Sequence, residues 1–90
     1  MPKVELTNHL KRFFPTLGPQ ALPASTVAEL VRALDERFPG IMGYLVDERG
    51  SLRKHVNIFI DGEMVVDRAG LGDALDERSE VFIAQALSGG

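Results

Sequence analysis

The sequence contains one long stretch with helical periodicity, Thr26-Val27-Ala28-Glu29-Leu30-Val31-Arg32-Ala33-Leu34-Asp35-Glu36-Arg37-Phe38. Its apolar residues recur at the spacing that forms one stripe of an α-helix, namely Val27, Leu30, Val31, Leu34 and Phe38. Thr26 and Glu29 have the spacing of a capping box, although Ser25 is an alternative cap. Proline disfavours helix at the residue before it, so Pro39 ends the pattern and Gly40 turns the chain. The stretch therefore predicts one main helix over residues 27–38.

The residues before this helix predict two strands. Residues 3–7 alternate polar and apolar, which is typical of a half-buried strand with Val4 and Leu6 facing the core. Pro15, Gly18 and Pro19 then interrupt any regular pattern. We expect a loop there, followed by a short second strand around residues 20–24.

The residues after the helix predict a hairpin. Residues 41–45 indicate a short helical turn and residues 47–51 a polar loop. Residues 55–60 are rich in β-formers and place Val56, Ile58 and Ile60 on one face. Asp61-Gly62 is the dipeptide favoured in tight hairpin turns, so residues 63–66 return as a short edge strand.

A last strand is predicted over residues 80–87, after a turn at residues 70–75 that Leu71 and Leu75 pin to the core. This segment is apolar on both faces, which is typical of a strand in the middle of a sheet. The parallel partner of such a strand is reached through a long crossover, which the helix supplies, so we expect it to pair with the first strand.

The predicted order of elements is β-β-α-β-β-β. One helix on one face of a mixed four- or five-stranded sheet is an α+β arrangement, the β-grasp fold of ubiquitin-like proteins. A ferredoxin-like fold is the alternative, but it needs a second long helix for which residues 67–79 are too short and glycine-rich. We expect a β-grasp domain over residues 1–87 and a flexible diglycine tail over residues 88–90.

Composition restricts the function classes. Ninety residues allow a single domain, and the absence of cysteine excludes disulfides, thiolate metal sites and a cysteine nucleophile. The net charge of −3 argues against nucleic acid as a partner. No signal peptide and no long apolar run is visible, so we expect a cytoplasmic protein that does not enter a membrane. His9 and His55 lack a third ligand at a characteristic spacing, and we expect no metal site.

The sequence closes with Ser88-Gly89-Gly90. Two final glycines arise by chance roughly once in 200 chains at average glycine usage. A frayed end needs no particular residue, whereas a tail that lies extended in a narrow channel benefits from the absence of Cβ atoms. We interpret the diglycine as a reactive tail, with a frayed end as the alternative.

Residues 56–63 (VNIFIDGE), the turn at 71–75 and residues 80–90 resemble the ubiquitin-like sulfur carriers of the MoaD/ThiS family. That family includes the small subunit of molybdopterin synthase, the thiamin sulfur carrier and the carrier of thiocarboxylate-dependent cysteine synthesis. The run from His55 to Glu63 is most similar to the last of these. Ser88 departs from the alanine that is common before the diglycine, but it is equally small.

The resemblance implies a protein cosubstrate rather than an enzyme, with no catalytic side chain and no bound cofactor. A ubiquitin-activating-like adenylyltransferase would use ATP to adenylate the Gly90 carboxylate, and sulfur would then displace AMP to leave a thiocarboxylate. A cysteine-synthase-like enzyme, the molybdopterin synthase large subunit or a thiazole synthase would accept the sulfur. Two alternatives stay open: a protein modifier conjugated through Gly90, and a non-covalent β-grasp interaction domain.

The last predicted strand also supplies a candidate docking surface. If Val81 and Ile83 face the helix, the opposite face presents Phe82, Ala84 and Ala86, and we expect these residues with Leu87 to bind partners. A register slip of one residue would exchange the two faces. Phe13 and Phe14 are expected to cover one edge of the core, with a role in an interface as the alternative.

Overall fold

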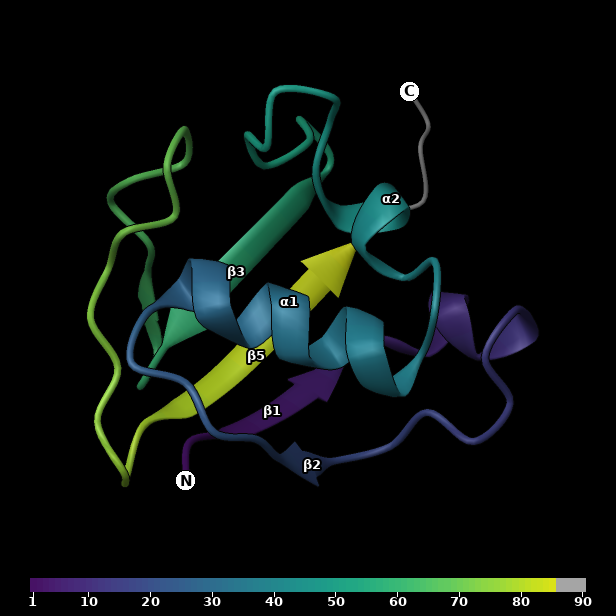
Figure 1. Ribbon diagram of the computed structural model, residues 1–90, viewed down its shortest axis with the longest axis horizontal. Coiled ribbons are helices and arrows are strands. Elements are labelled where there is room, and N and C mark those ends of the chain that lie inside the picture. The colour runs from purple at the N-terminus through teal and green to yellow at the C-terminus, as the bar shows by residue number, and fades with distance from the viewer. Residues whose placement is uncertain (86–90) are drawn as a thin grey trace.

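The computed structural model describes residues 1–85, apart from the side chains of residues 8 and 9. Its five strands form one mixed sheet in the order β2-β1-β5-β3-β4, and α1 lies across one face of that sheet (Figure 1). The elements are β1 (Lys3–Leu6), the 3-10 helix η1 (Asn8–Arg12), β2 (Gln20–Ala21), α1 (Val27–Arg37), α2 (Met42–Leu45), β3 (Val56–Ile60), β4 (Glu63–Met64) and β5 (Glu80–Gln85). This arrangement confirms the predicted β-grasp order, and the ferredoxin-like alternative is wrong because residues 67–79 contain no helix. Within residues 1–85 no helix is long and apolar enough to cross a membrane.

Strand β5 lies at the centre of the sheet, as its two apolar faces predicted. It runs parallel to β1, with Val4 opposite Val81, and antiparallel to β3, with Ile58 opposite Ile83. The ladder continues beyond β1, since the Thr7 N–H donates to the Ile83 carbonyl oxygen at 3.1 Å. The strand that leads to the tail is therefore bonded on both edges.

Helix α1 begins at the predicted cap. The Thr26 hydroxyl oxygen accepts the Glu29 N–H at 3.2 Å, while the Glu29 carboxylate accepts the N–H of Ser25 at 2.8 Å, one residue earlier than in a regular capping box. Thr26 rather than Ser25 is thus the cap. The helix ends at Arg37, one residue before the predicted end, because Phe38 leaves helical geometry at the residue before proline.

The core lies between α1 and the sheet. The predicted helix stripe is buried, as are Val4 and Leu6 of β1 and Val56 and Ile58 of β3. Leu71 and Leu75 are also buried, which confirms that they pin the turn at 70–75. Ile60 is half-buried at the end of β3.

The hairpin after β3 turns at Asp61 and Gly62, which have φ angles of 51° and 86° as a tight turn of this kind requires. Its return strand β4 covers only Glu63–Met64 and is shorter than the predicted 63–66. The Asp73 carboxylate accepts the N–H groups of Val66 and Asp67 at 3.0 and 2.8 Å, and this contact takes the chain out of the sheet. The structure also contains η1, which the loop-like pattern before residue 20 did not predict.

Candidate functional site

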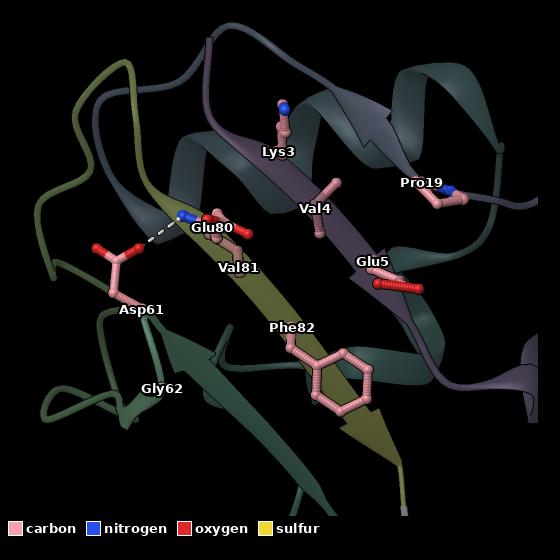
Figure 2. A pocket seen from close by; sticks show the side chains of 9 residues that line it. All are labelled: Lys3, Val4, Glu5, Pro19, Asp61, Gly62, Glu80, Val81 and Phe82. Carbon is pink, nitrogen blue, oxygen red and sulfur yellow. Dashed lines mark hydrogen bonds between the residues drawn. The ribbon is translucent and has the colours of Figure 1, made fainter.

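The outer face of the sheet, turned away from α1, carries the predicted docking residue Phe82. Val81 and Ile83 are buried, and Phe82 between them is 40% exposed. Figure 2 shows the Phe82 ring lying over the face of the sheet opposite the helices. The register expected for the last strand is therefore confirmed.

Phe82 belongs to a row that crosses four strands. The Cα register places Glu5 of β1 opposite Phe82, Phe82 opposite Phe59 of β3, and Phe59 opposite Met64 of β4. Directly opposed residues in a sheet share a face and are neighbours on it. We name Glu5, Phe82, Phe59 and Met64 the outer row, of which Met64 is 52% exposed and Phe59 is half-buried.

Sequence reasoning missed Phe59 and Met64. The alternation in residues 55–60 carried the signal, because Phe59 lies between Ile58 and Ile60 and must face the other way. Of the other predicted docking residues, Ala84 is half-buried and lies opposite Asn57 in the next row. Ala86 and Leu87 lie outside the described residues.

A groove of about 500 Å³ borders the outer row at the amino end of β5. Its lining combines apolar and charged residues from two strands and two loops (Figure 2): Lys3, Val4, Glu5, Pro19, Asp61, Gly62, Glu80, Val81 and Phe82. The Asp61 carboxylate accepts the Glu80 N–H at 2.9 Å, and the Asp61 N–H donates to the Glu80 carbonyl oxygen at 2.8 Å. This reciprocal pair ties the hairpin to β5 and fixes one wall of the groove. A groove that combines the exposed Phe82 ring with charged side chains suits a side chain of a protein partner.

The base of the tail is held in place at the other end of β5. The Gln85 N–H donates to the Thr7 hydroxyl oxygen at 3.2 Å, and Gln85 lies opposite Val56 in the sheet. The Gln85 amide nitrogen is 3.4 Å from His55 Nε2. Whatever follows Gln85 starts from a fixed point. The predicted tail residues Ser88, Gly89 and Gly90 lie outside the described residues, so their roles stay predictions.

The two phenylalanines near η1 have different environments. Phe14 packs edge-on against Phe38 with ring centroids 6.3 Å apart, which confirms that it covers one edge of the core. Phe13 is 57% exposed and stacks on Tyr44 at 5.2 Å. The expectation that Phe13 covers the core is therefore wrong, because the end of η1 turns its side chain outward.

Two loop carboxylates, Asp47 and Asp67, have lowered pKa values. The N–H groups of Arg49 and Ser51 donate to Asp47 and lower its pKa below 3.8. The N–H groups of Gly70 and Gly72 lower the pKa of Asp67 in the same way. Hydrogen bonds to the charged form explain both shifts, so these carboxylates stabilise loops.

Among the described side chains, which do not include that of His9, no three His, Asp or Glu residues gather closely enough to hold a metal ion. The expected absence of a metal in the whole chain stays a prediction.

Comparison with known proteins places this architecture in a family. A sequence model of the ThiS family matches residues 14–90. Small archaeal modifier protein 3 of Haloferax volcanii is 32% identical over 66 residues, which cover 73% of this chain and 71% of that protein.

Solved structures share the fold. A chain of the Amycolatopsis orientalis BexX/CysO complex superposes with a TM-score of 0.86 over 100% of both chains at 23% identity. CysO of Mycobacterium tuberculosis gives 0.84 over 97% of this chain and 100% of its own at 24% identity. SAMP1 of Haloferax volcanii gives 0.76 over 99% and 98% at 22% identity. Because the family model covers most of the sequence and the β-grasp fold agrees with it, this protein belongs to the ThiS family of ubiquitin-like proteins.

Proposed function

We propose that this protein is a sulfur carrier whose working group is the Gly90 carboxylate. A carboxylate oxygen attacks the α-phosphorus of ATP on a partner adenylyltransferase and releases pyrophosphate, which leaves an acyl-adenylate on Gly90. Hydrosulfide then attacks the carbonyl carbon and expels AMP, which leaves a thiocarboxylate. The observation that carries the proposal is that the match to the ThiS family extends through residue 90, five positions after the end of the central strand β5.

In this proposal the folded domain holds the C-terminal residues in position and provides the surface that binds the partner enzyme. Residues 86–90 span at most about 18 Å when fully extended, so the partner has to bind the folded body close to its own active site. The outer row is suited to this contact because Phe82 and Met64 expose apolar area beside a groove with charged walls. ATP belongs to the partner, and the carrier is consumed and regenerated as a cosubstrate.

The sulfur acceptor is the second partner. A cysteine-synthase-like enzyme, a molybdopterin synthase large subunit and a thiazole synthase each fit a thiocarboxylate donor. The similarity to a chain of the BexX/CysO complex supports the idea that a protein of this fold binds a separate protein partner. We place both reactions in the cytoplasm.

The intact mass of the protein, purified from its own source and treated with ATP, sulfide and the source's adenylyltransferase, tests the proposal. We expect a gain of about 16 Da on the C-terminal peptide, which corresponds to oxygen replaced by sulfur. A chain with Gly90 deleted is the control, and it should keep the fold but gain no mass. An unchanged mass in the intact protein, together with active enzyme, would contradict the carrier chemistry.

A protein modifier is the second candidate, which the 32% identity to small archaeal modifier protein 3 favours. A modifier shares the acyl-adenylate but transfers Gly90 to the amine of a target lysine. Lysine-linked adducts in lysate that contain the C-terminal peptide would support it. An abundant thiocarboxylate without such adducts would support the carrier.

Phe82 offers a direct test of the docking face. Phe82→Ser should cost less stability than the loss of a fully buried ring, because Phe82 is 40% exposed, and it should raise the KM of the adenylyltransferase for this protein at least tenfold. Val66→Ser is the matched control, since Val66 is 89% exposed and lies outside the outer row. Equal KM values for the two variants would refute docking through Phe82.

A further inference from the structure

A second exposed surface lies at the end of the sheet where the tail begins. Gln85 is flanked on one side by Thr7, which leads into η1, and on the other by His55 and the start of β3. Residues 7–13 and 53–55 therefore lie on opposite sides of the tail's base. Neither segment belongs to the outer row.

Two aromatic rings are exposed at this end. Phe13 and Tyr44 stack with an interplanar angle of 22°, and they are 57% and 36% exposed. The ring of Phe14 meets Tyr44 edge-on at 5.8 Å and supports it from the core side. Arg53 Nε donates to the Gly43 carbonyl oxygen at 3.0 Å, which attaches α2 to the segment before β3. The aromatic pair is thus held rigidly near the tail's base.

The same end carries cations without acidic neighbours in the sequence. Lys11, Arg12 and Lys54 are exposed. Residues 6–28 and 49–60 contain no Asp or Glu, although the whole protein has 13 acidic and 10 basic side chains. Arg53 and Lys54 each line a cavity together with Asp47, so neither is counted toward the positive charge of this surface. The positive charge is local, within a protein of net charge −3.

We propose that the basic aromatic patch, formed by Lys11, Arg12, Phe13 and Tyr44, binds an acidic surface of the enzyme that adenylates Gly90. The inference rests on the function proposed above. Because residues 86–90 reach at most about 18 Å, the patch beside Gln85 would face the rim of the channel that receives the tail. Opposite charges across such a rim set the orientation of docking and speed association. The net charge of −3 on the whole protein argues against a polyanionic nucleic acid as the partner of this patch.

The test is a charge reversal read out by ATP–pyrophosphate exchange with the adenylyltransferase of the source organism. We expect the double variant Lys11→Glu/Arg12→Glu to raise the KM for this protein about tenfold at low salt, with kcat unchanged. The wild-type KM should rise between about 50 and about 300 mM salt, and the variant should lose this dependence. Arg32→Glu/Arg78→Glu changes the net charge equally at exposed sites away from the patch, and its KM should stay within about twofold of the wild type. Phe13→Ala should raise KM without changing the salt dependence.

The outcomes separate the two proposals. Absence of exchange with the wild-type protein would overturn the proposed function, and the patch with it. Normal exchange with an unchanged KM for Lys11→Glu/Arg12→Glu would overturn the patch alone, as would an equal rise for Arg32→Glu/Arg78→Glu. Tight binding of a labelled single-stranded oligonucleotide that the Lys11→Glu/Arg12→Glu variant loses would overturn the assignment to a protein surface.

Discussion

Replacing Arg68 with alanine removes a set of contacts that fixes the start of β3. The half-buried guanidinium donates to the Asn57 side-chain oxygen at 3.0 Å and to the carbonyl oxygens of Arg53 and Val56 at 2.7 and 3.0 Å. The Arg68 carbonyl oxygen in turn accepts the Leu52 N–H at 2.8 Å. One side chain thus joins the loop after β4 to the strand beside the tail's base.

The magnitude follows from these three bonds. A hydrogen bond from a charged donor contributes about 1.5–3 kcal/mol, but the three share one group and water reaches part of it. We therefore expect Arg68→Ala to lower the free energy of unfolding by about 3 kcal/mol in urea denaturation. For a domain of this size, the melting temperature should fall by roughly 12–24 °C. Amide hydrogen exchange should accelerate first in residues 53–57, where the carbonyl groups of Arg53 and Val56 and the side-chain oxygen of Asn57 lose their donor.

Two further variants make the result interpretable. Arg68→Lys keeps the charge but loses the planar fork, so its stability should lie between those of the wild type and the alanine variant. Arg78→Ala removes an exposed arginine and should change stability by less than about 0.5 kcal/mol. If Arg68→Ala were as stable as Arg78→Ala, the contacts of the guanidinium would contribute nothing and the reasoning would be refuted.

Three other perturbations test the local structure. Thr26→Ala removes the acceptor of the Glu29 N–H and should cost about 1 kcal/mol in urea denaturation, whereas Thr26→Ser should not. Gly62→Ala places a side chain at a φ of +86° and should cost about 1–2 kcal/mol, whereas Gly43→Ala has open space and no positive φ and should be neutral or stabilising. The lowered pKa values of Asp47 and Asp67 mean that the unfolded chain binds more protons as the solution is acidified. Their stabilisation is present above a pH of about 4 and disappears as the pH falls through the folded-state pKa values, so Asp47→Asn/Asp67→Asn should flatten this acid decline in stability measured by urea denaturation.

Local patterns predicted most of the fold. The helix, its cap at Thr26 and the turn at Asp61-Gly62 depend on residues within a few positions of one another, so they can be predicted from the local sequence. The pairing of the first and last strands was also predictable, because a doubly apolar strand needs two neighbours. The same alternation placed Phe82 on the outer face.

Features that depend on distant residues could not be predicted. Phe13 and Tyr44 are 31 positions apart, and only the fold brings their rings together. Arg68 meets its acceptors 11 to 15 positions away through a loop whose path Asp73 determines. The shortening of β4 also depends on Asp73, whose carboxylate accepts the N–H groups of Val66 and Asp67. For the tail, the sequence predicts the chemistry, but residues 86–90 lie outside the described structure.

The placement of β5 also determines how the protein responds to mechanical force. Strand β5 is hydrogen-bonded to β1 on one edge and to β3 on the other. Tension applied along the axis of β5 would load both ladders in shear, so many bonds would have to break at once, whereas an edge strand would peel away one bond at a time. Under the proposed function, an enzyme could therefore pull on the segment after β5 without unfolding the domain.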